Sequence, residues 1–154
     1  MMDRACGIII RNNKLMFIEQ KCGNEIFHLF VGGGVEENET PEQAVIRELN
    51  EEANVSGEIL FGPITVSEKR RVEHMFIINI ANDAEPSPGY DPELPMNDQD
   101  ITGVIWLDAD IDIKIFTNKD IEYFKLIITK AEKQKVNSEW LIVLKRIVHN
   151  YRNE

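Results

Sequence analysis

The first third of the chain alternates short β-branched or apolar stretches with turn residues. Residues 4–11 and 14–20 are two such stretches, and Asn12-Asn13 lies between them. Two consecutive Asn residues are typical of the tight turn that joins antiparallel strands, so the pattern predicts a β-hairpin. Residues 26–31 form a third apolar stretch, which runs directly into Gly32-Gly33-Gly34. We therefore expect three strands followed by a glycine-rich loop.

The next segment carries the signals of a helix with defined ends. Thr40 is suited to the N-cap, Pro41 to the first helical position and Gln43 to the capping-box position. Asn54 follows the last residue of the helical pattern, and Asn tolerates the left-handed conformation in which many helices end. The pattern thus predicts a helix from Pro41 to Ala53.

The remainder of the chain predicts three more strands, a long loop and two helices. The strands are expected at residues 58–65, 72–81 and 102–107. Residues 84–95 contain four Pro and a Gly, which indicates a long irregular loop.

Two amphipathic helices are predicted in the tail. The first covers residues 120–135 and the second begins after Ser138. Strands on both sides of a central helix, with two C-terminal helices, indicate an α/β or α+β protein with a mixed β-sheet.

Composition restricts the class of protein further. The chain has 154 residues, of which 43% are hydrophobic, so residues 1–154 are expected to form a single domain. No apolar run is long enough to span a bilayer and the first residues do not resemble a secretory signal, so no membrane association is expected. Cys6 and Cys22 are too few for a disulfide framework, which favours the cytoplasm. A net charge of −10 argues against broad binding to nucleic acids.

The negative charge is concentrated in two segments. Residues 36–52 contain seven acidic residues and one basic residue, and residues 83–112 contain nine acidic residues and no Lys or Arg. Like charges at this density repel one another, and a bound cation is one way to compensate them. The alternative is that both segments are solvated acidic surfaces.

The spacing of three glutamates distinguishes the first segment from an ordinary acidic surface. On a helix from Pro41 to Ala53, Glu48, Glu51 and Glu52 share an arc of about 100° beside the apolar face. Glu48 and Glu52 are four residues apart, a position at which a surface helix usually places an opposite charge. Mg²⁺ and similar hard cations prefer such oxygen ligands. The pattern predicts either a divalent metal site or a solvated acidic face.

The full spacing resembles the Nudix box. In that box a glycine is followed, after five residues, by a glutamate and, after seven more residues, by the run Arg-Glu-apolar-x-Glu-Glu-x-Gly-apolar. The chain matches with Gly33, Glu39 and the run from Arg47 to Val55. One position departs, because Asn54 stands where the box has its last glycine. Val31 also replaces a proline that many members carry before the glycines.

This resemblance implies a fold, an activity and a set of roles. It implies the Nudix α/β/α sandwich with a mixed β-sheet, and hydrolysis of a nucleoside diphosphate linked to another moiety with Mg²⁺ or Mn²⁺. By resemblance, Glu51 and Glu52 are metal ligands, and Glu48 is a third ligand or the general base. The Gly32 carbonyl is a further ligand in the family. Glu39 and Arg47 resemble the structural ion pair of the box.

Residues outside the box are weaker candidates. In several Nudix branches a carboxylate from a loop completes the metal site, and the candidates here are Asp91, Glu93, Asp98 and Asp100, with Glu93 favoured for its longer side chain. The alternative is a solvated loop.

Arg70 and Arg71, beside Lys69, are either phosphate contacts or part of a solvated hairpin turn. Four aromatic residues of the predicted strands are expected mainly in the core, with stacking on a base as the alternative for one of them: Phe27, Phe30, Phe76 and Trp106.

Three other functions are open from the sequence. They are a catalytically silent Nudix domain that senses a nucleotide, an isopentenyl-diphosphate isomerase, and an acidic protein–protein module without metal. The intact glutamates disfavour the first, and neither Cys offers the context that the second needs. We expect a small nucleoside diphosphate derivative as partner, with the protein a monomer or homodimer. No marker of a particular substrate accompanies the box, which leaves a nucleoside triphosphate or a nucleotide sugar as candidates.

Overall fold

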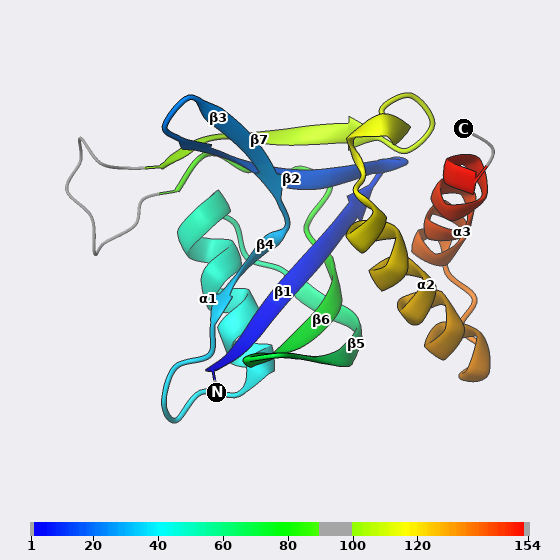
Figure 1. The fold of residues 1–154 in the computed structure, drawn as a ribbon, viewed down its shortest axis with the longest axis horizontal. Coiled ribbons are helices and arrows are strands. Elements are labelled where there is room, and N and C mark those ends of the chain that lie inside the picture. The colour runs from blue at the N-terminus through cyan, green and yellow to red at the C-terminus, as the bar shows by residue number, and fades with distance from the viewer. Residues whose placement is uncertain (1, 90–99, 153–154) are drawn as a thin grey trace. The chain divides into compact units, whose positions relative to one another are not determined.

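A mixed β-sheet and three α-helices make up the part of the chain that the computed structural model describes, residues 2–89 and 100–152 (Figure 1). The strands are β1 (Met2–Arg11), β2 (Lys14–Cys22), β3 (Glu25–Leu29), β4 (Val31–Gly34), β5 (Glu58–Glu68), β6 (Arg71–Asn79) and β7 (Ile101–Asp108). The helices are α1 (Pro41–Ala53), α2 (Asn118–Lys133) and α3 (Glu139–Arg152), with a short 3-10 turn at Ile113–Ile115. The predicted α/β class with a mixed sheet and two C-terminal helices is confirmed.

The sheet is mixed because β1 has a different relation to each neighbour. It pairs in parallel with β6 and antiparallel with β4 and β2. β5 and β6 form an antiparallel hairpin. The β1–β2 turn has positive φ at both Asn12 (52°) and Asn13 (63°), as a tight hairpin turn requires. β3 pairs with β2, and β7 also pairs with β2.

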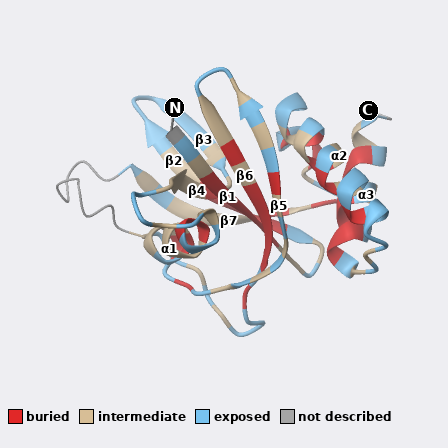
Figure 2. Cartoon of the chain, turned by 90° about the horizontal axis from the view of Figure 1, so that it is seen from below, coloured by how far each residue is buried: buried red, intermediate tan, exposed pale blue. Residues whose placement is uncertain are grey.

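The described residues form two compact units, one within residues 2–9, 16–89 and 100–106 and the other within residues 10–15 and 107–152. In the first unit, α1 packs its apolar side on the sheet, as the buried residues of α1, β1 and β6 show (Figure 2). Its core contains Val45 and Leu49 from the helix and Phe76 and Ile78 from β6. This packing fixes the side of α1 that stays outside the core.

The second unit contains the two C-terminal helices, which pack against each other. Each buries one face, led by Phe124 in α2 and by Leu144 in α3. α2 begins two residues earlier than the sequence pattern predicts, because Thr117 and Asp120 form a capping box that starts the helix at Asn118. No helix among the described residues is long and apolar enough to cross a membrane.

The predicted signals of α1 are confirmed. The Thr40 hydroxyl accepts a hydrogen bond from the Gln43 N–H at 3.1 Å, and the Gln43 side chain accepts one from the Thr40 N–H at 2.9 Å. Asn54 closes the helix in the left-handed conformation, with φ 56° and ψ 31°.

Two expectations about residues 26–34 are wrong. The glycines do not form a loop: they lie in β4, which pairs with β1 from Val31 to Gly34. The sequence also assigned Phe27 to the core, but it is 42% exposed on β3. β3 has a neighbour only on the β2 side among the described strands, so its apolar side chains remain at the surface. Of the other three aromatics, Phe76 is buried, while Phe30 and Trp106 are partly buried.

Candidate active site

The outer edge of β4 is in contact with α1. In an antiparallel pair, alternate residues direct both backbone polar groups toward the partner strand, and the residues between them direct both groups away. Gly32 is a residue whose backbone groups point away from β1, and its N–H donates a hydrogen bond to Glu52 Oε1 at 2.8 Å. The Gly34 carbonyl accepts one from Arg47 Nη2 at 3.0 Å. By the same alternation the Gly32 carbonyl is directed to the edge where Glu52 lies.

The close approach of helix and strand requires glycine in β4. A Cβ atom at Gly33 would lie 2.2 Å from Glu48 Oε1, and one at Gly32 would lie 2.6 Å from the Ala5 carbonyl oxygen. Neither distance is possible between non-bonded atoms, so a side chain at Gly33 would displace the Glu48 carboxylate and one at Gly32 would displace β4 from β1. Gly33 therefore leaves room for the Glu48 carboxylate, and Gly32 allows β4 to pair closely with β1.

Arg47 connects the acidic side chains of α1 to the segment before it. Its Nε and Nη2 donate to the two carboxylate oxygens of Glu39 at 2.8 and 3.0 Å, which is a bidentate pair. Its Nη1 donates to Glu48 Oε1 at 3.0 Å and to Glu51 Oε2 at 3.2 Å. The guanidinium holds the pKa of Glu39 below its usual value. Arg47 thus orients Glu48 and Glu51 as well as Glu39.

Burial makes Glu52 and Glu48 unusual carboxylates. Burial raises the pKa of Glu52 to about 8, against the opposing effect of the Gly32 N–H, and the nearby charges of Glu48 and Glu51 add to the rise. Burial also raises the pKa of Glu48, although hydrogen bonding to Arg47 opposes the rise. A carboxylate in this setting gains from a proton or a cation, and it is a stronger base than a solvated one.

The donor set fits a hard divalent cation in its chemistry. Glu48, Glu51 and Glu52 lie on adjoining turns of α1 next to the β4 edge, to which the Gly32 carbonyl is directed. In residues 2–89 and 100–152, however, no three His, Cys, Asp or Glu side chains are gathered closely enough to hold an ion between them. Two of the carboxylates are hydrogen-bonded to Arg47 and the third to Gly32.

The other predicted site residues lie elsewhere or outside the described residues. Asp91, Glu93 and Asp98 fall outside them. Asp100 is exposed, and its backbone carbonyl accepts a hydrogen bond from the Lys21 N–H at 2.9 Å.

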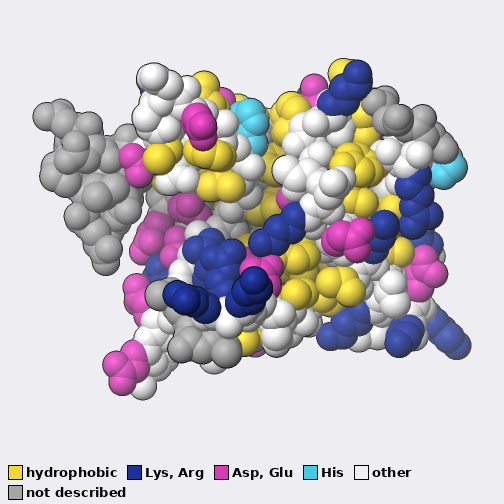
Figure 3. Space-filling view, in the orientation of Figure 1, with side chains coloured by type: hydrophobic (Ala, Val, Ile, Leu, Met, Phe, Trp, Pro, Cys, Tyr) yellow, Lys and Arg dark blue, Asp and Glu magenta, His cyan; other side chains and the backbone are white. Residues whose placement is uncertain are grey.

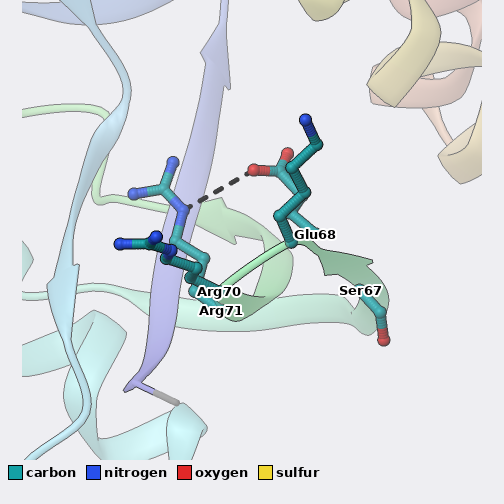
Figure 4. Close-up of a pocket in the computed structure, with 5 residues that line it drawn as sticks. Ser67, Glu68, Arg70 and Arg71 are labelled. Atoms are coloured by element: carbon teal, nitrogen blue, oxygen red, sulfur yellow. Dashed lines mark ion pairs between the residues drawn. The ribbon is translucent and has the colours of Figure 1, made fainter.

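Arg70 and Arg71 lie at the β5–β6 hairpin, in a surface hollow that residues 67–71 line (Figure 4). The Nε of Arg71 is 3.6 Å from Glu68 Oε2 and 3.5 Å from Glu73 Oε2. The hairpin turn is confirmed, and one of its two arginines faces a buried carboxylate that the sequence did not single out.

Arg4 and Glu73 are charged residues that sequence reasoning missed. The parallel register places Arg4 opposite Glu73, and Arg4 Nε is 3.8 Å from Glu73 Oε2. Glu73 is only 6% exposed, and it lies between Arg4 and Arg71. Basic and acidic side chains are also seen side by side in the region of β1 in Figure 3. The charge of Arg4 opposes the rise that burial causes in the pKa of both Glu48 and Glu52.

Replacement of Arg47 by Lys tests the role of its hydrogen bonds. A lysine keeps the charge but cannot make the bidentate contact with Glu39 while also reaching Glu48 and Glu51. We expect Arg47→Lys to lower the free energy of unfolding by about 1–3 kcal/mol, measured by urea denaturation. The exposed Arg70→Lys is the matched control, with a change below about 0.5 kcal/mol. Equal small changes in both variants would contradict the role of Arg47.

Comparison with known proteins places this geometry in a family. A family model for the NUDIX domain matches residues 1–123. An 8-oxo-dGTP diphosphatase from Proteus vulgaris is 43% identical over 63 residues, which cover 36% of this chain and 56% of that relative. The chain therefore matches little more than half the length of that curated relative.

Solved structures share the fold at low identity. The solution structure of the E. coli ORF135 protein matches with a TM-score of 0.62 and 16% identity, over 90% of this chain and 95% of that one. A hydrolase of the NUDIX family from Clostridium perfringens matches with a TM-score of 0.59 and 16% identity, over 96% of both chains. The family model covers most of the chain and includes the whole of the α1–β4 contact, so this protein belongs to the NUDIX family.

Proposed function

We propose that this protein hydrolyses a phosphoanhydride bond in a nucleoside diphosphate linked to another moiety, using Mg²⁺ or Mn²⁺. The observation that carries the proposal is the contact of α1 with β4, which holds Glu48 and Glu52 in a partly buried position beside a backbone edge. A nucleoside triphosphate is the first substrate to test, because the Proteus vulgaris relative is named an 8-oxo-dGTP diphosphatase. The unpaired Cys6 and Cys22 support the proposal that it acts in the cytoplasm.

NUDIX hydrolases generally use divalent metal ions. In this chain Glu51 and Glu52 would hold the ion, with the Gly32 carbonyl as a further ligand and Glu48 as a third carboxylate ligand or the general base. A bound ion neutralises phosphate charge and lowers the pKa of water in contact with it.

The residues of the chain have separable tasks in this proposal. The raised pKa of Glu48 suits it to accept a proton from water, since a base works best when its pKa lies near the working pH. Arg47 orients Glu48 through its Nη1, and the Glu39 carboxylate in turn fixes the plane of that guanidinium. Glu52 is oriented by the Gly32 N–H.

Arg4 and Arg71 are the proposed contacts for the negative charge of the substrate. Arg47 is not one of these contacts, because each of its three nitrogens already donates to a protein oxygen. Arg4 and Arg71 share the carboxylate of Glu73, and Arg71 also faces Glu68. All three contacts are made through the Nε atoms and are 3.5–3.8 Å long. Guanidinium groups bind phosphate oxygens well. Arg70 extends the same hairpin toward solvent.

The activity itself is tested by phosphate or pyrophosphate release from a panel of nucleoside triphosphates, nucleotide sugars and dinucleotides. We expect release from at least one compound, dependent on Mg²⁺ or Mn²⁺. Glu52→Gln should lower kcat by about 10²–10⁴-fold, because the amide removes the charge that the site places at β4. Circular dichroism should show the same fold in the variant.

The matched control is Glu42→Gln, which makes the same chemical change on an exposed position in the first turn of α1. It should retain the wild-type kcat. Full activity of Glu52→Gln, or of the wild type in excess chelator, would contradict the proposal. Tight nucleotide binding without turnover of any compound would instead indicate the silent, sensing function.

Arg4→Gln tests the proposed substrate contact. Loss of one charge-assisted hydrogen bond to phosphate should raise KM for the substrate by about tenfold or more, with a smaller effect on kcat. Lys133→Gln at the exposed end of α2 removes the same charge from the second unit and should leave KM unchanged. An unchanged KM in Arg4→Gln would remove Arg4 from the substrate site.

A further inference from the structure

A short segment after β6 is hydrogen-bonded to the C-terminal end of α1. The Ser87 N–H donates to the Ala53 carbonyl at 3.0 Å, and the Gly89 N–H donates to the Glu52 carbonyl at 2.8 Å. The last four carbonyl groups of a helix have no partner within the helix, so these bonds satisfy two of the four. The sequence assigned residues 87–89 to a loop and gave no sign of this contact.

The side chain of Asn54 adds a second connection between the same two segments. Its Nδ2 donates to the Pro88 carbonyl at 3.0 Å and lies 3.2 Å from Ser87 Oγ. Asn54 is the one position at which the chain departs from the box, where a glycine is expected. Glycine would adopt the same left-handed conformation at no cost, but it has no side chain to bind residues 87–88.

Gly89 allows the segment to touch the helix backbone. A Cβ atom at this position would lie 1.6 Å from the Glu51 carbonyl oxygen, so no other residue fits without displacing one of the two segments. The contact therefore falls on the helical turn whose side chains are Glu51 and Glu52. Backbone contact of this kind restrains the Cα atoms of Glu51 and Glu52, and the Glu52 side chain in turn accepts a hydrogen bond from the Gly32 N–H of β4.

We propose that Asn54 is a positioning residue for Glu51 and Glu52, acting with Ser87 and Gly89 to clamp the last turn of α1. This inference rests on the proposed function, since it assigns the clamp to the geometry of the catalytic carboxylates. A misplacement of about 1 Å at a catalytic group costs up to about 100-fold in rate, so a clamp on the backbone of that turn has a measurable effect on turnover. A purely structural cap would instead affect stability alone.

Asn54→Gly separates the two roles, because it removes the amide and keeps the left-handed helix end. We expect kcat to fall about tenfold and the Mg²⁺ concentration for half-maximal activity to rise about fivefold, with KM for the nucleotide little changed. Without substrate, backbone amides of residues 51–54 should exchange hydrogen at least tenfold faster than in the wild type. Gly89→Ala should change all three quantities in the same direction.

Lys135→Gly is the matched control. Lys135 has the same positive φ of 56° just beyond α2, in the second unit, so the substitution places glycine at another left-handed helix end without touching α1. It should leave kcat, the Mg²⁺ dependence and the exchange of residues 51–54 at wild-type values. Wild-type values of kcat and Mg²⁺ dependence in Asn54→Gly would overturn the inference and leave the proposed function standing. Absence of hydrolysis by the wild type would overturn the proposed function, and with it the catalytic role of the clamp.

Discussion

The contact between the outer edge of β4 and the acidic side of α1 determines the rest of the site. It depends on the absence of side chains at Gly32 and Gly33, because a Cβ atom at Gly33 would overlap the Glu48 carboxylate and one at Gly32 would overlap the Ala5 carbonyl of β1. The core packing of α1 on the sheet sets the rotation of the helix, and the capping box at Thr40 sets where it begins. Each of these features is needed for the carboxylates to lie at the β4 edge.

The same contact creates an electrostatic problem that the chain resolves only in part. Three carboxylates occupy adjoining turns, and Arg47 compensates two of them by hydrogen bonds. Glu52 receives one N–H donor and retains a raised pKa, so a cation at this position would relieve both its desolvation and the repulsion from its neighbours. This imbalance is what distinguishes the site from a solvated acidic helix, whose charges water would screen.

Local signals in the sequence predicted α1 well, and contacts between distant segments could not be predicted. The ends of α1 follow from the hydrogen-bonding chemistry of a few adjacent residues, and the spacing of the box located the three glutamates. The strand character of the glycines depends on pairing with β1, the Arg4–Glu73 pair depends on the parallel register of β1 and β6, and the clamp depends on residues 87–89 returning to α1. A single sequence carries no local signal for such pairings.

The most direct test of the account is the effect of Mg²⁺ on the melting temperature of the wild type and of the triple variant Glu48→Gln, Glu51→Gln, Glu52→Gln. A cation that binds the native state raises Tm in proportion to its affinity. The account predicts that Mg²⁺ raises the Tm of the wild type in a saturable manner and has little effect on the triple variant. Equal shifts in both proteins would show that the ion binds elsewhere and would contradict the assignment of the site to α1.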